Sequence, residues 1–237
     1  MKASDIFVLI GCEESQTIAL AFRELGVNAF SCDLKPCSGG HPEWHIQGDV
    51  FEAVNTRHWD LAIFHPECTY LTVTANKWLK DQPARKSGAL VGHARRAARN
   101  EAVDFFINLT KVHIDRWAIE NPVGCMSTVL RKPDQIIQPM MFGHPEPKKT
   151  CLWLKNMPKL KATDSVEPEY HITATGKRLP KWYAYADKSQ GQAKRAEIRS
   201  VTFPGIAKAM GHPIHGLHFK PQRTHIILTH NHHEKTH

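Results

Sequence analysis

Short apolar runs of strand length alternate with amphipathic segments along this chain, and this alternation constrains the fold more than any other feature. Residues 6–10 form a continuous apolar run that ends at Gly11, and residues 15–25 then carry apolar side chains at helical spacing. Gly26 ends that helix, and a second apolar run occupies residues 27–32. This order predicts an α/β fold in which a parallel sheet is covered by helices on both faces.

Later segments extend the same pattern. Further strands are expected at residues 48–50, 60–64, 117–119 and 151–154. Residues 89–112 are rich in good helix formers and include three arginines, so we predict one long amphipathic helix there. Its apolar stripe runs through Ala94, Ala98, Val103, Phe106 and Leu109. A short helix over residues 203–210 is expected because it begins with a proline, which the first helical turn tolerates.

The length of the chain suggests how it is organised. Its 237 residues can hold one sizeable core and a small appendage, because single cores stop growing near about 250 to 300 residues. We predict a main core over residues 1–157 that is completed by residues 198–220. Residues 158–197 are polar, basic and poor in aliphatic side chains, which is typical of a small recognition insertion. The histidine-rich residues 221–237 are expected to form a disordered tail.

The composition disfavours several classes of protein. No apolar run approaches the roughly 18 to 20 residues of a membrane span, and the first residues lack a signal-peptide pattern, so we expect a cytoplasmic protein. The six cysteines lack the spacing of a disulfide scaffold or of a zinc site, which favours free thiols. A formal net charge of +8 favours an anionic partner such as nucleic acid, although basic surfaces also serve solubility.

Candidate ligand-binding residues follow the expected strands, where open parallel sheets bind ligands. Gly11, Cys12 and Glu13 form a turn before the first helix, whose terminal amides could contact a nucleoside-like ligand. The turn lacks the G-x-G-x-x-G pattern, which disfavours a nicotinamide dehydrogenase, and an ordinary strand-to-helix turn is the alternative. Asp33 and Asp49 could accept hydrogen bonds from ribose hydroxyls and an adenine amino group, or could be solvated cap carboxylates.

Two further strand ends carry reactive side chains. Cys68 follows a strand and a proline-bearing turn, so its thiol could be exposed as a nucleophile, with a buried inert cysteine as the alternative. Glu120 follows another strand, where partial burial could raise its pKa enough to hold or donate a proton to a ring nitrogen. Taken alone, Glu120 could equally be a cap.

Taken in chain order, these segments resemble the DNA cytosine-5 methyltransferase family, in particular its short, divergent phage and prophage members. Residues 11–16 are similar to the first cofactor loop, residues 65–68 to the proline-cysteine nucleophile loop, and residues 120–122 to the Glu-Asn-Val motif. Residues 143–150 occupy the position of the Gln-x-Arg-x-Arg segment, and residues 200–210 are similar to the last motif. The order and spacing of these short motifs carry the resemblance.

The resemblance implies a Rossmann-like methyltransferase sheet, S-adenosylmethionine as cofactor, DNA as partner, no required metal, and a bacterial or phage-infected cytoplasm as location. Cys68 would attack carbon 6 of a flipped cytosine, Glu120 would engage ring nitrogen 3, and Lys148 stands where the family has its first arginine. The implied cofactor contacts are Gly11, Cys12, Glu13, Asp33, Asp49 and Pro66. The implied substrate contacts are Asn121, Lys149, Lys181 and Trp182.

The chain also departs from the family pattern. Glu67 replaces the proline before the cysteine, and its charge would raise the pKa of the thiol. Thr150 replaces a base-contacting arginine. Only residues 158–197 are left for target recognition, where basic and aromatic side chains could bind phosphates and stack on bases, or form a solvated loop. Two alternatives stay open, namely a methyltransferase of free pyrimidine nucleotides or other modified bases, and a catalytically impaired DNA-binding protein.

Overall fold

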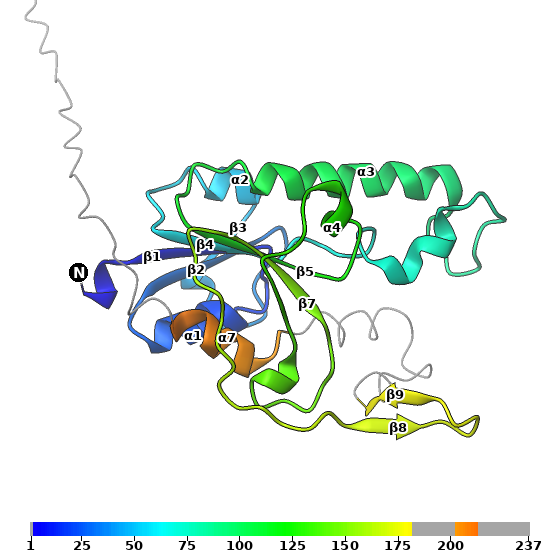
Figure 1. Cartoon of the computed structure of the whole chain (residues 1–237). Helices are drawn as coiled ribbons and strands as arrows, with labels where there is room; N and C mark the ends of the chain where they lie inside the picture. The colour runs from blue at the N-terminus through cyan, green and yellow to red at the C-terminus, as the bar shows by residue number, and fades with distance from the viewer. Residues whose placement is uncertain (1, 182–201, 213–237) are drawn as a thin grey trace, which may run out of the picture.

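The structure, a computed structural model, describes residues 2–181 and 202–212. Within them, seven strands form one mixed sheet in the order β3-β2-β1-β4-β5-β7-β6 (Figure 1). They are β1 (Phe7–Gly11), β2 (Asn28–Asp33), β3 (His45–Gln47), β4 (Leu61–Phe64), β5 (Trp117–Pro122), β6 (Gln135–Ile137) and β7 (Thr150–Lys155). β1 to β5 run parallel, whereas β7 is antiparallel to its neighbours β5 and β6. This arrangement is typical of a Rossmann-like methyltransferase sheet, so the predicted fold class is confirmed.

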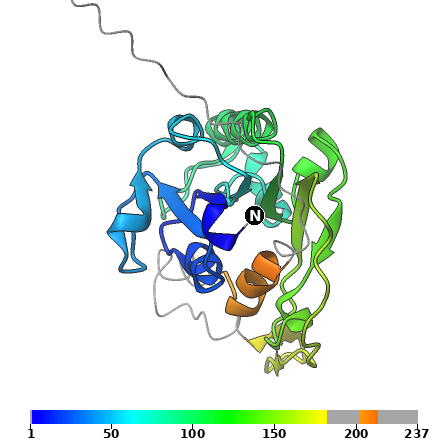
Figure 2. The same ribbon diagram turned by 90° about the vertical axis from the view of Figure 1, so that its left-hand side faces the viewer.

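Helices cover both faces of the sheet (Figure 2). The α-helices are α1 (Thr17–Glu24), α2 (Val50–Ala53), α3 (Gly92–Leu109), α4 (Met126–Val129) and α7 (Pro204–Gly211). Short 3-10 helices are η1 (Ala3–Asp5), η2 (Pro42–Trp44), η3 (Val73–Leu79) and η4 (Pro139–Met141). α1 and α7 pack on one face, and α2 and α3 pack on the other. No helix in the described part of the chain is long and apolar enough to cross a membrane.

The central strand β1 serves two cores because its side chains alternate between the faces of the sheet. Val8 and Ile10 join the apolar cluster that contains α1 and α7, whereas Leu9 joins the cluster that contains α2 and α3. All three side chains are fully buried. A strand that is buried on both faces has to be apolar at every position, which explains the continuous apolar run with which the fold begins.

Two predictions about the sheet need correction. The prediction of a strand at residues 48–50 is wrong. Asp49 instead caps α2 by accepting a hydrogen bond from Phe51 N at 2.7 Å. The strand of this region is β3, which ends two residues earlier at Gln47. The sheet is also mixed rather than fully parallel, because β7 returns antiparallel beside β5.

The long helix α3 begins at Gly92, and its predicted apolar stripe is wrong in the first turn. Ala94 is exposed, whereas the side chain of Arg95 is buried, with only 4% of the residue exposed. Arg95 points inward because its guanidinium donates a hydrogen bond to Thr69 O at 2.9 Å. A guanidinium can be buried where carbonyl oxygens accept its protons, so its charge did not identify the exposed face.

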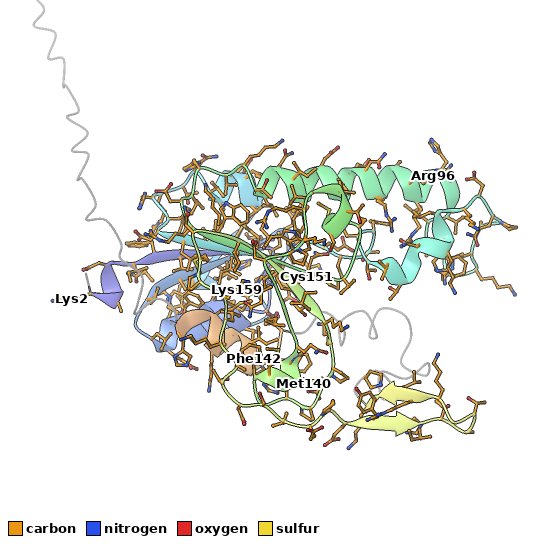
Figure 3. All side chains as sticks on the ribbon, in the orientation of Figure 1. Lys2, Arg96, Met140, Phe142, Cys151 and Lys159 are labelled. Carbon is orange, nitrogen blue, oxygen red and sulfur yellow. The ribbon has the colours of Figure 1, made fainter. Side chains whose placement is uncertain are left out.

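After β7 the chain forms a strap, defined here as residues 161–169. Thr163 N donates to Met141 O at 3.1 Å, and Val166 N donates to Met140 O at 2.9 Å. These hydrogen bonds tie the strap to the loop that leads into β7, on which Met140 and Phe142 are labelled in Figure 3. The strap therefore runs beside the loop that carries Lys148.

The strap leads to a hairpin of two strands, β8 (Tyr170–Ile172) and β9 (Arg178–Pro180), which pair antiparallel. It projects on the side of the molecule on which the parallel strands end (Figure 1). This hairpin lies within the predicted recognition insertion, whereas Trp182 and the predicted tail lie outside the described residues. The predicted division into core, insertion and tail stays a prediction.

Candidate active site

Residues from several strands meet at one edge of the sheet. β1 ends there at Gly11, β4 at Phe64 and β5 at Pro122. Pro122 pairs with Thr150, the first residue of β7. Because β7 is reversed, residues that precede it reach the same edge as residues that follow the parallel strands. Ligands of open α/β sheets bind at this carboxyl edge, and the candidate residues of the strand ends lie there.

The turn after β1 is tightly packed, and backbone amides of helix α1 bind the carboxylate of Glu13 in this turn. Cys12 has a φ of 60°, and a Cβ added to Gly11 would lie 2.6 Å from the Phe64 side chain, so this position has no room for one. Glu13 is 6% exposed, and its two oxygens accept hydrogen bonds from amides of α1 at 2.6 and 3.2 Å. Burial raises the pKa of Glu13 overall. Both oxygens of this predicted cofactor contact are therefore used within the protein.

Sequence reasoning missed Gln16, which joins this turn to the loop that follows β2. Gln16 is fully buried with a φ of 59°. Its Nε2 donates to His41 O at 2.8 Å, and its Oε1 accepts from His41 N at 3.0 Å. A Cβ added to Gly39 would lie 2.6 Å from Cβ of Gln16, so the two loops approach closely. A single glutamine before a helix is too common a feature to have revealed this contact.

Asp33 and Asp49 lie near the Cys12 thiol, as their predicted shared site requires. Burial raises the pKa of Cys12 to about 12, and the charges of both carboxylates contribute to the increase. Asp33 Oδ1 accepts from Lys35 N at 2.9 Å, and Asp49 Oδ1 accepts from Phe51 N at 2.7 Å. No hydrogen bond to a described residue is recorded for the second oxygen of either carboxylate. Each acid can therefore cap its own loop and still contact a ligand.

Cys68 lies among charged side chains from three parts of the chain. Burial raises the pKa of its thiol, the charges of Glu120 and Glu67 raise it further, and the charge of Lys148 lowers it. Cys68 keeps partial exposure and belongs to neither apolar core cluster, and its role as nucleophile stays a prediction. The expected direction of the Glu67 effect is confirmed, but burial and Glu120 contribute more than Glu67 does.

The pKa of Glu120 shifts opposite to the sequence prediction. Burial would raise it, but hydrogen bonds with His65 and Thr150 and the charges of His65 and Lys148 lower it overall. His65 Nδ1 lies 3.5 Å from Glu120 Oε2, and the two side chains are 12% and 23% exposed. These contacts therefore favour the ionised form of Glu120. The sequence suggested burial alone, because nothing in it shows that His65 reaches this strand.

Asn121 faces the protein interior, where it fixes the Cys68 loop (residues 65–73) to β5. Asn121 is 1% exposed, and its Nδ2 donates to Pro66 O at 2.8 Å. Its Oδ1 is buried without a hydrogen-bond partner among the described residues. Asn121 and Pro66 thus contact each other. The substrate role of Asn121 and the cofactor role of Pro66 stay predictions.

The first turns of α3 hold the Cys68 loop from one side. Arg95 Nη2 donates to Thr69 O at 2.9 Å, and Arg99 Nε donates to Tyr70 O at 2.7 Å. Hydrogen bonds from charged donors are stronger than those between neutral groups. Arg95 and Arg99 are therefore positioning groups for the loop that carries the candidate nucleophile.

The chain after β5 holds the same loop from the other side. Thr72 forms a bridge with Gly124, where an added Cβ would overlap the carbonyl of Leu71, so only glycine permits this approach. At the outer end of the following segment, Arg96 (labelled in Figure 3) pairs with Asp81 at 3.0 Å. The Cys68 loop is thus fixed along most of its length.

Three consecutive residues around the start of β7 have different environments. Lys148 lowers the pKa of both Cys68 and Glu120, so its ammonium lies near them. Thr150 is 3% exposed and shares a hydrogen bond with Glu120. Lys149 is exposed, and no hydrogen bond or ion pair of its side chain with the described residues is recorded. The structure thus brings Lys148 to the site and gives no contact there for Lys149.

Helix α7, the predicted last motif, packs on the loop that carries Lys148. Gly205 N donates to His144 Nε2 at 3.0 Å, and a Cβ added to Gly205 would overlap the carbonyl of Phe142. Lys148 Nζ lies 5.8 Å from the ring centroid of Phe203, which precedes the helix. Helix α7 therefore supports the loop that precedes β7 and carries Lys148.

The hairpin presents one cation over an aromatic ring and closes at an ion pair. The Arg178 guanidinium lies 3.7 Å from the ring centroid of Tyr170. At the base, Lys181 Nζ lies 2.6 Å from Glu169 Oε2, and Lys181 N donates to Glu169 O at 3.0 Å. The predicted substrate contact Lys181 thus joins the two ends of the hairpin.

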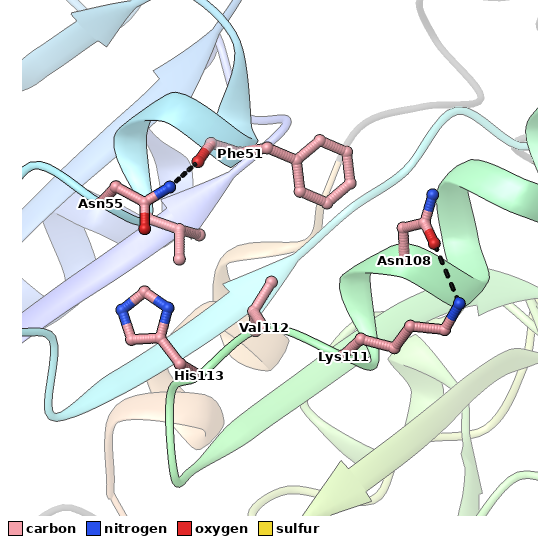
Figure 4. A pocket seen from close by; sticks show the side chains of 7 residues that line it. Phe51, Asn55, Asn108, Lys111, Val112 and His113 are labelled. Atoms are coloured by element: carbon pink, nitrogen blue, oxygen red, sulfur yellow. Dashed lines mark hydrogen bonds between the residues drawn. The ribbon is translucent and has the colours of Figure 1, made fainter.

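A surface hollow of about 380 Å³ lies apart from these residues (Figure 4). Its lining residues are Phe51, Val54, Asn55, Asn108, Lys111, Val112 and His113. None of the candidate site residues lines it. Within the described part of the chain, no three His, Cys, Asp or Glu side chains cluster as metal ligands would.

The strand order and the reversed β7 define the class of fold, that of the Rossmann-like methyltransferases. No protein-family model matches the chain, and no curated protein matches its sequence. Among solved structures, it is similar to one described as a candidate DNA modification methyltransferase encoded within an E. coli prophage, at 15% identity and a TM-score of 0.40. The alignment covers 69% of this chain and 51% of that one, so this chain spans about half of that length.

Proposed function

We propose that the chain is an S-adenosylmethionine-dependent DNA methyltransferase of the cytosine-5 type, with Cys68 as its nucleophile. The observation that carries this proposal is the convergence of Cys68, Glu120 and Lys148 at the carboxyl edge of the sheet. A thiol, a carboxylate and an ammonium are the groups required to add sulfur to a pyrimidine ring while a ring nitrogen is protonated.

The groups around Cys12 suit the nucleoside part of S-adenosylmethionine, which supplies an electrophilic methyl group when bound. Asp33 and Asp49 each have one oxygen outside their recorded hydrogen bonds, and carboxylates accept hydrogen bonds from ribose hydroxyls and from an adenine amino group. With a pKa of about 12, the Cys12 thiol stays neutral and adds no charge beside these acids.

Cys68 has to lose its proton as its sulfur bonds to carbon 6 of cytosine. Glu120 is ionised and adjacent, so it accepts this proton and passes it to ring nitrogen 3, which neutralises the adduct. The ammonium of Lys148 stabilises the thiolate during this transfer. After carbon 5 has gained the methyl group, its proton passes to water, ring nitrogen 3 returns its proton to Glu120, and departure of the Cys68 sulfur as thiolate restores the aromatic ring.

Positive charge supports DNA as the substrate. The chain carries a formal net charge of +8, and binding to phosphates releases counterions. Arg178 and Tyr170 form a cation and ring pair on the hairpin, which projects beside the catalytic edge. Such a pair suits contact with a nucleic acid backbone and its unstacked bases.

The test is transfer of radiolabelled methyl groups from S-adenosylmethionine to unmethylated duplex DNA, followed by analysis of the nucleosides. We expect label in 5-methylcytosine with the wild-type protein and none with Cys68→Ser. Cys37→Ser is the matched control, because Cys37 is also partly exposed but lies in the loop that follows β2 rather than in the Cys68 loop. Loss of the cofactor's binding in Asp33→Ala, measured by calorimetry, checks the nucleoside contacts separately.

One observation favours a second function, that of a DNA-binding protein without methyl transfer. The pKa of the Cys68 thiol is raised, which disfavours the nucleophilic thiolate in the free protein. Binding of cofactor and DNA without label in any product would identify this function. Label in free pyrimidine nucleotides in a parallel reaction would instead assign the enzyme to the nucleotide pool.

A further inference from the structure

His65 follows β4 directly and is held rigidly between the first cofactor turn and the candidate active site. Its backbone N donates to Gly11 O at 3.0 Å, which continues the pairing of β4 with β1. Its side-chain nitrogen Nδ1 lies 3.5 Å from Glu120 Oε2. The ring is 12% exposed, so solvent screens this pair only weakly.

The other side of the His65 ring faces the interior. Nε2 is buried and has no hydrogen-bond partner among the described residues. Burial raises the pKa of Glu13. Among the groups that lower this pKa, His65 has the largest effect, so the Glu13 carboxylate lies near the ring as well. One imidazole thus lies between two largely buried carboxylates, and polar groups in such surroundings are costly unless they compensate one another.

The titratable groups around Glu120 come from every element packed against it. They are His65 after β4, Cys68 in the following loop, Lys148 before β7 and Cys151 within β7. Lys148 acts on the thiol as well as on the carboxylate. Of these groups, His65 is the one recorded both as a hydrogen-bond partner of Glu120 and as a charge that acts on it.

We propose that His65 is a positioning residue that sets the orientation and the charge of Glu120 for its encounter with a pyrimidine ring. This inference rests on the proposed function and adds a residue to its machinery. His65 Nδ1 lies 3.5 Å from Oε2, and this contact favours the ionised form of Glu120, so that the carboxylate can accept the Cys68 proton. No bond is made to His65 itself.

The sign of the effect follows from the surroundings of Glu120. Without His65 the carboxyl loses a hydrogen bond and a favourable charge, so burial dominates and the pKa of Glu120 rises. A protonated Glu120 cannot accept the thiol proton. The acid limb of the pH-rate profile should therefore move to higher pH, with a loss in kcat rather than in KM.

The test measures the pKa of the Glu120 carboxyl directly, by ¹³C NMR titration of protein labelled at glutamate. The spectrum of Glu120→Gln identifies the Glu120 signal. His65→Gln and His65→Asn remove the imidazole beside Glu120, and circular dichroism reports whether each variant folds. His58→Gln is the matched control, because His58 Nε2 also lies 3.4 Å from a carboxylate, Asp60 Oδ1, but precedes β4 at the opposite edge of the sheet.

We expect the Glu120 titration to shift to higher pH in the His65 variants and to stay unchanged in His58→Gln. In methyl transfer, kcat should fall by about tenfold or more while KM changes by less than about twofold. An unchanged Glu120 titration in a folded His65 variant overturns the inference, whether or not the protein is active. Absence of 5-methylcytosine from the wild type overturns the proposed function, and the titration distinguishes that failure from this one.

Discussion

At the scale of single residues, Glu67 places a negative charge beside the candidate nucleophile. Thr69 Oγ1 donates to Glu67 Oε1 at 2.6 Å, which holds the carboxylate within the turn. Its charge contributes to the raised pKa of the Cys68 thiol, although burial and Glu120 contribute more. The thiol is therefore less reactive in the free protein than an exposed cysteine, and the proposed reaction requires that base binding favour the thiolate.

Replacement of Glu67 by glutamine should lower the pKa of the Cys68 thiol, because one of the charges that oppose thiolate formation is removed. At neutral pH a larger thiolate fraction should make alkylation of Cys68 by iodoacetamide severalfold faster, measured by mass spectrometry of the Cys68 peptide across pH. Glu101→Gln, at an exposed position of α3, should leave the rate unchanged. An equal rate in Glu67→Gln would show that this charge does not act on the thiol.

Residue types at strand ends predicted much of the candidate site, but not the charge states within it. The sequence indicated Asp33, Asp49 and Cys68, and the structure places the two carboxylates near Cys12 and the thiol near Glu120 and Lys148, while the roles of these residues stay predictions. The lowered pKa of Glu120 could not be predicted, because it depends on a pairing between His65 and a strand more than fifty positions away. Patterns within short windows do not contain such pairings.

At the scale of elements, the Cys68 loop is clamped between α3 and the chain after β5. Arg95 and Arg99 bind its carbonyls from one side, and the close approach of Gly124 fixes the other. A loop held in this way needs little rearrangement to present its thiol, which lowers the entropic cost of reaching a reactive geometry.

Loss of the Arg99 side chain should loosen this loop. Arg99→Met removes the hydrogen bond to Tyr70 O, and amide exchange at Leu71 and Thr72 should become about tenfold faster or more, measured by hydrogen-deuterium exchange. Lys111→Met is the control, because Lys111 lies just beyond the other end of α3 and bonds only Asn108 among the recorded contacts. Unchanged exchange in Arg99→Met would exclude the arginine as an anchor.

Periodicity predicted the elements that are long or fully buried and failed for those that tertiary contacts decide. β1 and α1 were expected within a few residues of their bounds. Residues 48–50 looked like a strand, but Asp49 caps helix α2, which begins at Val50, and a short stretch of this kind does not distinguish the two structures. The inward side of α3 was misassigned because Arg95 is buried against carbonyls.

At the scale of the whole molecule, α7 closes the fold by packing against α1 and against the loop before β7. Gly211 meets Leu25 at the end of α1, where an added Cβ would lie 2.6 Å from Leu25 Cδ1. Gly205 meets the backbone of Phe142 even more closely. Segments from both ends of the described chain therefore depend on one another.

Gly205→Ala should destabilise the protein, because the new methyl group would overlap the rigid carbonyl of Phe142. Overpacking of this kind costs about 1 to 3 kcal/mol, so the Tm should fall by roughly 4 °C or more in differential scanning calorimetry. Gly48→Ala is the control, since a Cβ there meets nothing within 4 Å. Equal Tm values for the two variants would contradict the close packing of α7.

The class of fold was predictable from the alternation of strands and helices, but the direction of β7 was not. A reversed strand has the same side-chain pattern as a parallel one, and only its pairing with β5 distinguishes them. That reversal is what brings Lys148 to the carboxyl edge, so the sequence located this residue through family resemblance rather than through the predicted sheet.

The ion pair between Glu169 and Lys181 marks a boundary at which the hairpin could be replaced by another. Everything between these two residues is a hairpin whose ends are already joined, by a backbone hydrogen bond of 3.0 Å and the side-chain contact of 2.6 Å. A different hairpin could be inserted there while the strap keeps its hydrogen bonds to the loop before β7. Hybrid proteins joined at this boundary would present a different hairpin and keep the same candidate active site.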